Sequence, residues 1–488
     1  EKLPALERDF LRVLYRKYDR AVKLPAAFVT AAAKAEGLSQ AAWAAARRND
    51  DFAAFLPHLA AMIGFARERS RFWGFGEEAA GPSGNGLRGG GSPGGGLRGG
   101  GSSGGGCDGG PSGNGLRGGG PSGNGLHDSG PSGGGSPGGG LYDGLLDIYE
   151  PGMPASRISA LFGPLRDRLT ALLKKIRACP PPDTAFLDQD FDTGAQARLN
   201  GALMDYLGFD RNRGRLDTSA HPFTTTLGDD DVRITTRYFP RNLLSGIFSV
   251  IHETGHAFYE MGFPRELRGT SLADGCSMAL HESQSRFWEN VIGRSRPFWE
   301  GFYPVLRDHF PGRLGSVGLD AFYAAVNRVA DSPIRVDADE VSYTLHIILR
   351  FELEKRLVAG ELDPARLPAV WREYTREYLG HESDTDAGGV LQDVHWSMGS
   401  FGYFPSYALG NLYGLQIAGK LREDLGDLDA LTARGQFAEI RDWLGDRIYR
   451  WGCRLEPAEL LMKVTGETLS AEPFVNYIET KYGSLYGI

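Results

Sequence analysis

Two histidines and a glutamate within five residues are the part of this sequence best suited to chemistry. His252, Glu253 and His256 form an H-E-x-x-H pattern inside an apolar run. Two histidines four residues apart lie on one face of a helix, so both imidazoles can reach a single metal ion. The glutamate between them points to the side of that ion, where it can take a proton from a metal-bound water. The pattern therefore predicts a metal site with a general base.

A third metal ligand is expected on the next predicted helix. Glu282, in the segment His281-Glu282-Ser283-Gln284, is the candidate. Two histidines and one glutamate are a recurring ligand set for catalytic zinc, and they leave the fourth position open for water and substrate. The same set also suits cobalt or another divalent ion. We therefore predict Zn²⁺ as the cofactor, held by His252, His256 and Glu282.

The predicted helix around His252 must position these groups. Pro240 stands where a helix can begin, and Gly262 followed by Pro264 can end it. Apolar residues recur between them at helical spacing: Leu243, Leu244, Ile247, Phe248 and Ile251. The alternative is a helix with two surface histidines. An apolar, buried helix favours the metal site, because burying ionisable groups is costly unless they are paired or bind a metal.

The overall composition excludes several classes of function. The apolar content of 41% and charged content of 23% are those of a soluble globular protein. A net charge of −8 gives no support for nucleic-acid binding. No stretch approaches the length of a membrane span, so no membrane partner is predicted. The four cysteines are scattered without a C-x-x-C pair, which predicts a reduced, cytoplasmic protein.

The chain divides into three parts by composition. Residues 1–78 read as an N-terminal helical region, and residues 141–488 as a helical catalytic region. Between them, residues 79–140 are rich in Gly, Ser and Pro, and a ten-residue unit at 82–91 returns unchanged at 111–120. Such a segment lacks the apolar residues needed for a core, which predicts a disordered insert. A specific binding tract is the alternative.

A small sheet is predicted just before the metal helix. Residues Thr224–Phe239 look β-like, with alternation from Asp231 to Tyr238. This spacing places Asp231, Arg233 and Thr235 on one face of a strand. The rest of the chain has helical patterning, so the predicted fold is mainly α with a small sheet. An edge strand beside the metal could bind an extended peptide by backbone hydrogen bonds.

Six motifs in a fixed order resemble the carboxypeptidase Taq family of metallocarboxypeptidases. That family is marked by HPF, DxRxT, HExxH, HESQ, IRxxAD and GxxQDxHW. In this sequence they are His221–Phe223, Asp231–Thr235, His252–His256, His281–Gln284, Ile334–Asp339 and Gly389–Trp396. The resemblance covers residues 141–488 densely and residues 1–78 loosely. The family usually carries a further N-terminal stretch, so this chain is expected to begin late.

The resemblance implies both a fold and an activity. The fold would be a large helical metallopeptidase with a deep groove and a small β-sheet beside the metal site. The protein would be a homodimer that releases single residues from peptides with a free C-terminus. His252, His256 and Glu282 would hold the metal. Glu253 would activate the metal-bound water for attack on the last peptide bond and then pass its proton to the leaving amine.

A C-terminal exopeptidase must recognise a free carboxylate, and an arginine fork does this best. Arg335 is our first candidate and Arg233 the second. The alternative for each is a structural ion pair. The partner would be Asp337 or Asp339 for Arg335, and Asp231 for Arg233.

Further polar residues of the motifs are candidates for the rest of the site. His221, His395 or Tyr403 could donate a hydrogen bond to the tetrahedral oxyanion, although His221 could instead be a core histidine. Gln392 and Asp393 are assigned to the substrate-binding side, where they could orient a ligand histidine.

These observations predict a zinc-dependent carboxypeptidase. One alternative is a zinc endopeptidase or oligopeptidase with the same chemistry but no carboxylate anchor. The other is a non-catalytic, truncated homologue in which the late start and the glycine-rich segment make an interaction scaffold. The free or blocked C-terminus of a peptide substrate would separate the first two classes.

Overall fold

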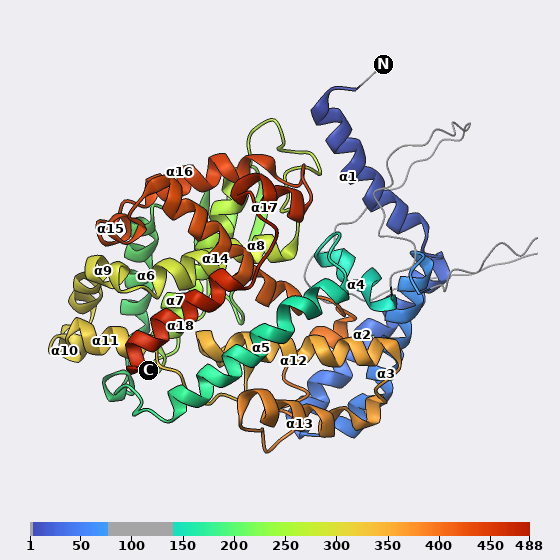
Figure 1. Cartoon of the computed structure of the whole chain (residues 1–488), viewed down its shortest axis with the longest axis horizontal. Helices are drawn as coiled ribbons and strands as arrows, with labels where there is room; N and C mark the ends of the chain where they lie inside the picture. Colours follow the sequence, from blue (N-terminus) through green and yellow to red (C-terminus); the bar gives the residue numbers. More distant parts are fainter. Residues whose placement is uncertain (1–2, 77–139) are drawn as a thin grey trace, which may run out of the picture. The chain divides into compact units, whose positions relative to one another are not determined.

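The computed structural model describes residues 3–76 and 140–488, which form helices and one small sheet (Figure 1). The predicted disordered insert lies outside the described residues, except for Gly140. No helix of the described residues is both long and apolar enough to cross a membrane. The mainly α fold with a small sheet beside the metal helix is confirmed.

The helices before the sheet are α1 Ala5–Val22, α2 Ala26–Asn49, α3 Phe52–Phe72, α4 Leu141–Tyr149, α5 Ala155–Arg177 and α6 Thr193–Leu207. Those after it are α7 Leu243–Met261, α8 Met278–Arg286, α9 Arg296–His309, α10 Pro311–Leu314, α11 Leu319–Val326, α12 Glu340–Ala359, α13 Leu367–Leu379, α14 Pro405–Leu425, α15 Leu428–Ala433, α16 Phe437–Arg447, α17 Pro457–Thr465 and α18 Glu472–Tyr486. Three short segments matter for the site: the π-helix η2 Phe287–Gly293 and the 3₁₀-helices η3 Arg335–Asp337 and η5 His395–Met398.

The sheet has three strands, β1 Gly214–Thr218, β2 Thr224–Gly228 and β3 Asp231–Thr236, in the order β1-β3-β2. The predicted strand region contains β2 and β3, which pair antiparallel. β1 was not predicted, and it pairs parallel with β3. Val232 and Ile234 are buried on the opposite face of β3 from Asp231 and Arg233, as the alternation predicts.

The metal helix α7 begins slightly later than its sequence predicts. Pro240 precedes the helix, but Asn242 is the N-cap, and its side chain accepts a hydrogen bond of 3.1 Å from the Ser245 amide. The helix ends at Gly262, as predicted. Helix α8 carries the HESQ motif, as predicted, and Ser277 caps it by accepting from the Leu280 amide at 3.0 Å.

Helix α8 is held closely between α7 and α14, and α14 also contacts α12, α17 and α18 (Figure 1). Two glycines allow these close contacts. A methyl group on Gly255 of α7 would lie 2.7 Å from the Gln284 carbonyl oxygen, and one on Gly410 of α14 would lie 2.7 Å from Cγ of Glu282. Helix α8 is therefore closely packed on both sides near Glu282, and this packing fixes the position of the carboxylate relative to α7.

We expect Gly255→Ala to destabilise the protein by about 1–3 kcal/mol, because the new methyl group meets the backbone of α8 rather than a flexible side chain. Gly64→Ala on α3 is the matched control. Its methyl group meets no atom within 4 Å, so this change should stabilise by about 0.5–1 kcal/mol. Thermal unfolding of both variants measures the difference. An unchanged melting temperature in Gly255→Ala would show that α7 and α8 are not in close contact.

Candidate metal centre

His252, His256 and Glu282 bring three ligand atoms together. Their donor atoms all lie within 4.8 Å of one another. Oε2 of Glu282 lies 3.7 Å from Nε2 of His252 and 3.4 Å from Nε2 of His256. The two histidines come from one face of α7 and the glutamate from the facing side of α8. The predicted ligand set is therefore assembled by the packing of two helices.

His252 is oriented by a carboxylate that was not predicted. Its Nδ1 lies 2.9 Å from Oε2 of Glu289, in the π-helix η2. Two arginines hold Glu289 in turn: Arg286 at 3.3 Å and Arg294 at 3.2 Å. Arg286 also donates from Nε to Oε1 of Glu282 at 2.7 Å. Glu289 therefore leaves Nε2 of His252 as the nitrogen available to a metal.

His256 is oriented by a second histidine. Nδ1 of His256 lies 2.6 Å from Nδ1 of His281, and Nε2 of His281 lies 2.8 Å from Oε1 of Glu260. Thr226 of β2 donates to the other oxygen of Glu260 at 2.8 Å. With His281 donating to Glu260, its Nδ1 accepts the proton of His256 Nδ1. This arrangement leaves Nε2 of His256 free to coordinate.

The protonation states of His256 and Glu282 also suit a metal. Burial lowers the pKa of His256 to about 4, so this imidazole is neutral at neutral pH. Burial alone would raise the pKa of Glu282, but Arg286 and His252 outweigh it and keep that pKa well below the usual value. Metal ligands must be neutral imidazoles and ionised carboxylates. The donor set therefore fits a divalent cation.

We expect Glu289→Gln to weaken metal affinity by about 10-fold to 100-fold, because the amide loses the charge that makes His252 a better donor. Chelator competition with the folded protein measures this change. Glu439→Gln, an exposed position on α16, is the matched control and should have no effect. An unchanged affinity in Glu289→Gln would assign this carboxylate to packing alone.

A cavity of about 290 Å³ opens in front of the three ligands. We call it the metal-site cavity, and it is lined by Pro222, Phe223, Thr224, His252, Glu253, His256, Met278, His281, Glu282, Tyr403, Ser406 and Tyr407. Glu253 is buried in its wall, and Thr224 of β2 donates to Oε2 of Glu253 at 2.6 Å. Burial raises the pKa of Glu253 above its ordinary value. A carboxylate with a raised pKa beside the ligands is suited to accept a proton.

Two neighbouring tyrosines, with ring centres 5.2 Å apart, form another part of the wall. Tyr403 and Tyr407 line the metal-site cavity, and burial raises the pKa of both phenols. His395 stands behind them, with Nε2 at 3.2 Å from the hydroxyl of Tyr407. Burial lowers the pKa of His395 to about 4, so its imidazole is neutral at neutral pH. Tyr403 therefore faces the cavity directly, whereas His395 reaches it through Tyr407.

Arg335 is buried and pairs with Asp393 rather than with Asp337 or Asp339, the partners that the sequence suggested. Its Nε and Nη2 donate to Oδ1 of Asp393 at 3.0 and 2.8 Å. Arg350 donates from Nε to Oδ2 of the same carboxylate at 2.7 Å. Two guanidinium groups therefore share one carboxylate, which leaves a net positive charge.

This basic cluster lies beside the metal-site cavity. The guanidinium carbon of Arg335 is 5.0 Å from the centre of the Tyr407 ring. The side-chain oxygen of Gln392 accepts from the backbone amide of Arg335 at 2.7 Å. The hydrogen bonds of Gln392 and Asp393 thus hold the arginine segment. The groups that orient the ligand histidines are Glu289 and His281, not Gln392 or Asp393.

Arg233 and His221 occupy different surroundings. Arg233 is partly exposed on β3 and forms a two-bond pair with Asp231 at 2.8 and 2.9 Å, the alternative suggested by the sequence. His221 is exposed, so it is not a core histidine, and it is not among the described residues that line the metal-site cavity. Its carbonyl accepts from the hydroxyls of Ser219 and Thr235, which fixes the loop carrying Pro222 and Phe223.

Three residues that act on the site were given no role by the sequence: Glu289, His281 and Thr224. Glu289 follows Glu282 by two helical turns, a spacing that could have suggested one helix face. His281 and Thr224 each belong to a motif, but their partners come from another element. No local pattern indicates such contacts.

The sequence profile of the carboxypeptidase Taq (M32) metallopeptidases matches residues 1–80 and 134–482. Over 471 residues the chain is 41% identical to thermostable carboxypeptidase 1 of Thermus thermophilus, which covers 96% of this chain and 82% of that protein. It is 43% identical over 346 residues to carboxypeptidase 1 of Bacillus subtilis, covering 71% of this chain and 69% of that protein.

A solved structure is also similar to this chain. The crystal structure of the M32 carboxypeptidase from Deinococcus radiodurans superposes with a TM-score of 0.85 at 32% identity. The superposition covers 100% of this chain and 86% of that one. The similarity therefore extends over the helices, the sheet and the metal centre together.

Proposed function

The chain belongs to the carboxypeptidase Taq (M32) family of metallopeptidases and is a metallocarboxypeptidase, and we propose which of its residues carry each part of the hydrolysis. His252, His256 and Glu282 hold the ion, which we propose to be Zn²⁺, with Co²⁺ or another divalent ion as a substitute. The bound ion supplies Lewis-acid chemistry, since it acidifies water and polarises the scissile carbonyl. The convergence of the three donor atoms, with a neutral His256 and an ionised Glu282, supports this assignment.

Glu253 is the general base. Thr224 fixes its Oε2, so Oε1 is left to accept the proton of the attacking water. The raised pKa of Glu253 makes the protonated form accessible, and this form then donates to the leaving amine. The carboxylate lies in the wall of the metal-site cavity, between the ligand helix and β2. It can therefore serve both proton transfers without moving between elements.

Tyr403 is the donor to the developing oxyanion, because its hydroxyl stays protonated and lines the cavity. His395 supports it indirectly by bonding the neighbouring Tyr407. The exposed imidazole of His221 is given no part in this step. The order β1-β3-β2 makes β2 an edge strand, and we propose that it binds the peptide backbone beside Thr224.

The carboxylate of the substrate binds at Arg335. The observation that carries this proposal is that Arg335 and Arg350 share Asp393 as their one carboxylate partner among the described residues. The surplus positive charge lies next to Tyr407, in the wall of the metal-site cavity. Arg233, by contrast, is neutralised one-to-one by Asp231. A free carboxylate thus gains more from Arg335 than from Arg233.

The test compares an N-acetylated peptide that has a free C-terminus with its amidated twin. Both are incubated with zinc-loaded enzyme, and Glu253→Gln is the blank. We expect release of the last residue from the free peptide only. Equal cleavage of both peptides would replace the carboxylate anchor with an endopeptidase mechanism. No cleavage by folded, metal-loaded protein would overturn the proposed roles altogether.

We further propose a cytoplasmic homodimer, on the family resemblance and on the scattered cysteines of the sequence. Sedimentation of the purified protein tests the dimer. A single species with the mass of one chain at micromolar concentration would contradict it.

A further inference from the structure

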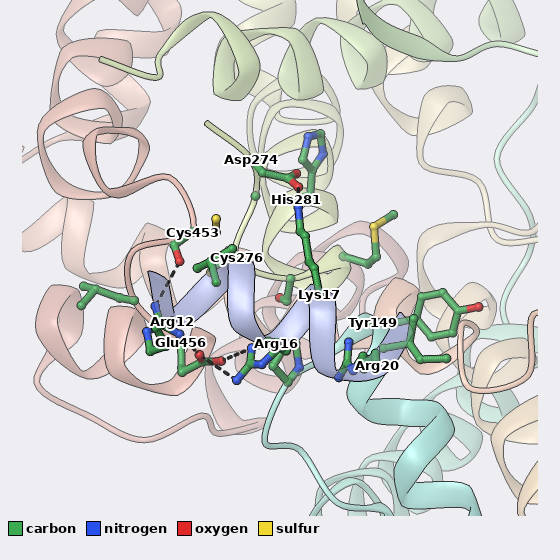
Figure 2. A pocket seen from close by; sticks show the side chains of 17 residues that line it. Arg12, Arg16, Lys17, Arg20, Tyr149, Asp274, Cys276, His281, Cys453 and Glu456 are labelled. Carbon is green, nitrogen blue, oxygen red and sulfur yellow. Dashed lines mark hydrogen bonds and ion pairs between the residues drawn. The ribbon is translucent and has the colours of Figure 1, made fainter. Parts of the chain in front are cut away.

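Figure 2 shows a second cavity, of about 200 Å³. It adjoins the metal-site cavity, because Met278 and His281 line both. We call it the α1 cavity, because helix α1 forms one of its sides. Val13 of α1 packs with Leu267 and Leu272 in a small apolar cluster of its own. This cluster fixes α1 over the cavity. The two cavities are therefore neighbouring parts of one surface rather than separate features.

Helix α8 relates the two cavities to the proposed carboxylate anchor. Its first residue, Met278, lines the α1 cavity, and Glu282 is the ligand four residues later. Its last residue, Arg286, lies 4.3 Å over the ring of Tyr343, whose hydroxyl accepts from Arg335 at 3.1 Å. The arginine cluster and the α1 cavity thus lie toward opposite ends of α8, with the metal ligands between them.

The order of the arginine cluster, the metal ligands and the α1 cavity along α8 sets the direction of a bound peptide. If the C-terminal carboxylate binds Arg335 and the scissile bond lies at the ligands, the preceding residues must leave toward Met278. Four helical residues rise about 6 Å, which equals about two residues of extended chain. The side chain two or three residues before the scissile bond therefore reaches the α1 cavity.

The α1 cavity is basic. One face of α1 contributes all of its cationic lining residues, as Figure 2 shows: Arg12, Arg16, Lys17 and Arg20. Arg20 is bound to Asp147, outside the lining. The remaining three cations face only two lining carboxylates. The cavity therefore carries a positive charge that a ligand can neutralise.

Lys17 and Arg16 are the cations whose positive charge is only partly neutralised by nearby carboxylates. Arg12 and Arg16 share one carboxylate, Glu456, and Arg16 binds both of its oxygens at 2.9 Å, so two positive charges face one negative charge. Lys17 stands 3.6 Å from Asp274, with 56% of its side chain exposed. In Figure 2 the Lys17 side chain extends from α1 toward Asp274 and His281. His281 lines both cavities, so Lys17 points toward the boundary between them. A ligand leaving that cavity meets Lys17 first.

We propose that the α1 cavity is an upstream subsite that favours an Asp or Glu side chain two or three residues before the scissile bond. Arg16 and Lys17 recognise the carboxylate. A basic side chain would meet like charges, and a neutral one would leave the surplus charge unpaired. This inference rests on the proposed function, because the direction of the peptide depends on Arg335.

The experiment uses zinc-loaded enzyme and N-acetylated alanine pentapeptides with a free C-terminus. The third or fourth residue from the C-terminus is Glu, Gln or Lys. We expect kcat/KM to be about threefold to fivefold higher for Glu than for Gln at one of these positions, the effect of one exposed ion pair. Lys should be the poorest of the three. The preference should shrink as salt is raised, since exposed charges are screened.

Variants of α1 decide whether the α1 cavity is responsible. In Lys17→Met and Arg16→Gln the ratio of Glu to Gln rates should fall toward one. Lys23→Met, at the end of the same helix and paired with Asp19, is the matched control and should keep the ratio. A ratio of one in the wild type, or a ratio that persists in both variants, would overturn the proposal.

A short substrate separates this outcome from a failure of the proposed function. N-acetyl-dialanine spans only the scissile bond and does not reach the α1 cavity. If the wild type releases alanine from it but shows no preference among the pentapeptides, only the subsite is wrong. If the wild type leaves it intact and also leaves the pentapeptides intact, the proposed function itself fails.

Discussion

Replacing Glu253 with glutamine is expected to lower kcat by about 10²-fold to 10⁴-fold, the usual contribution of a general base. Glutamine has nearly the same shape and can still accept the hydrogen bond from Thr224. It cannot take the proton of the attacking water or deliver one to the leaving amine. Because the side chain binds neither Nε2 of the ligand histidines nor Glu282, metal affinity and stability should stay close to those of the wild type.

The measurement is single-turnover hydrolysis with metal content determined on the same sample. Glu439→Gln is the matched control, since it makes the same chemical change on an exposed face of α16. Thr224→Val gives a graded comparison, because it removes the hydroxyl that bonds the carboxylate and the backbone carbonyl of Glu253 but keeps the base itself. A Glu253→Gln protein with full metal and full activity would rule out this residue as the base.

The parts of the site that could be predicted are those encoded within one helix. His252, Glu253 and His256 have a fixed spatial relation once the segment is helical, whatever surrounds it. The third ligand, Glu282, required the additional inference that a second helix packs on α7. Gly255 and Gly410 bring those helices together, but no spacing in the sequence shows which surfaces they will meet.

The groups around the ligands could not be predicted for two physical reasons. Glu289 reaches His252 from a π-helical segment, whose hydrogen bonding alters the helical phase on which spacing arguments rely. The partner of Arg335 is Asp393, which is remote in sequence, whereas a spacing argument considers only nearby acids. Strand β1 was missed for a similar reason, since its five residues alternate too briefly to stand out and its partner is β3.

Replacing Arg335 with glutamine is expected to lower kcat/KM for peptides with a free C-terminus by about 100-fold, the cost of losing one partner of a buried charged hydrogen bond. The fold should tolerate the change, because Arg350 remains bonded to Asp393 and no carboxylate is left buried alone. The loss should appear mainly in KM if the arginine binds substrate and transition state equally. Activity on amidated peptides, already low, should not fall further.

The ratio of activities on free and amidated peptides is the decisive quantity, because a general loss of stability lowers both equally. Arg233→Gln is the matched control, since it removes an arginine whose charge Asp231 already neutralises. It should keep the wild-type ratio, whereas Arg335→Gln should reduce it toward one. The reverse pattern would move the carboxylate site to β3, beside the proposed peptide-binding edge. In that case the peptide would lie in a different direction across α8, and the α1 cavity would no longer be upstream of the scissile bond.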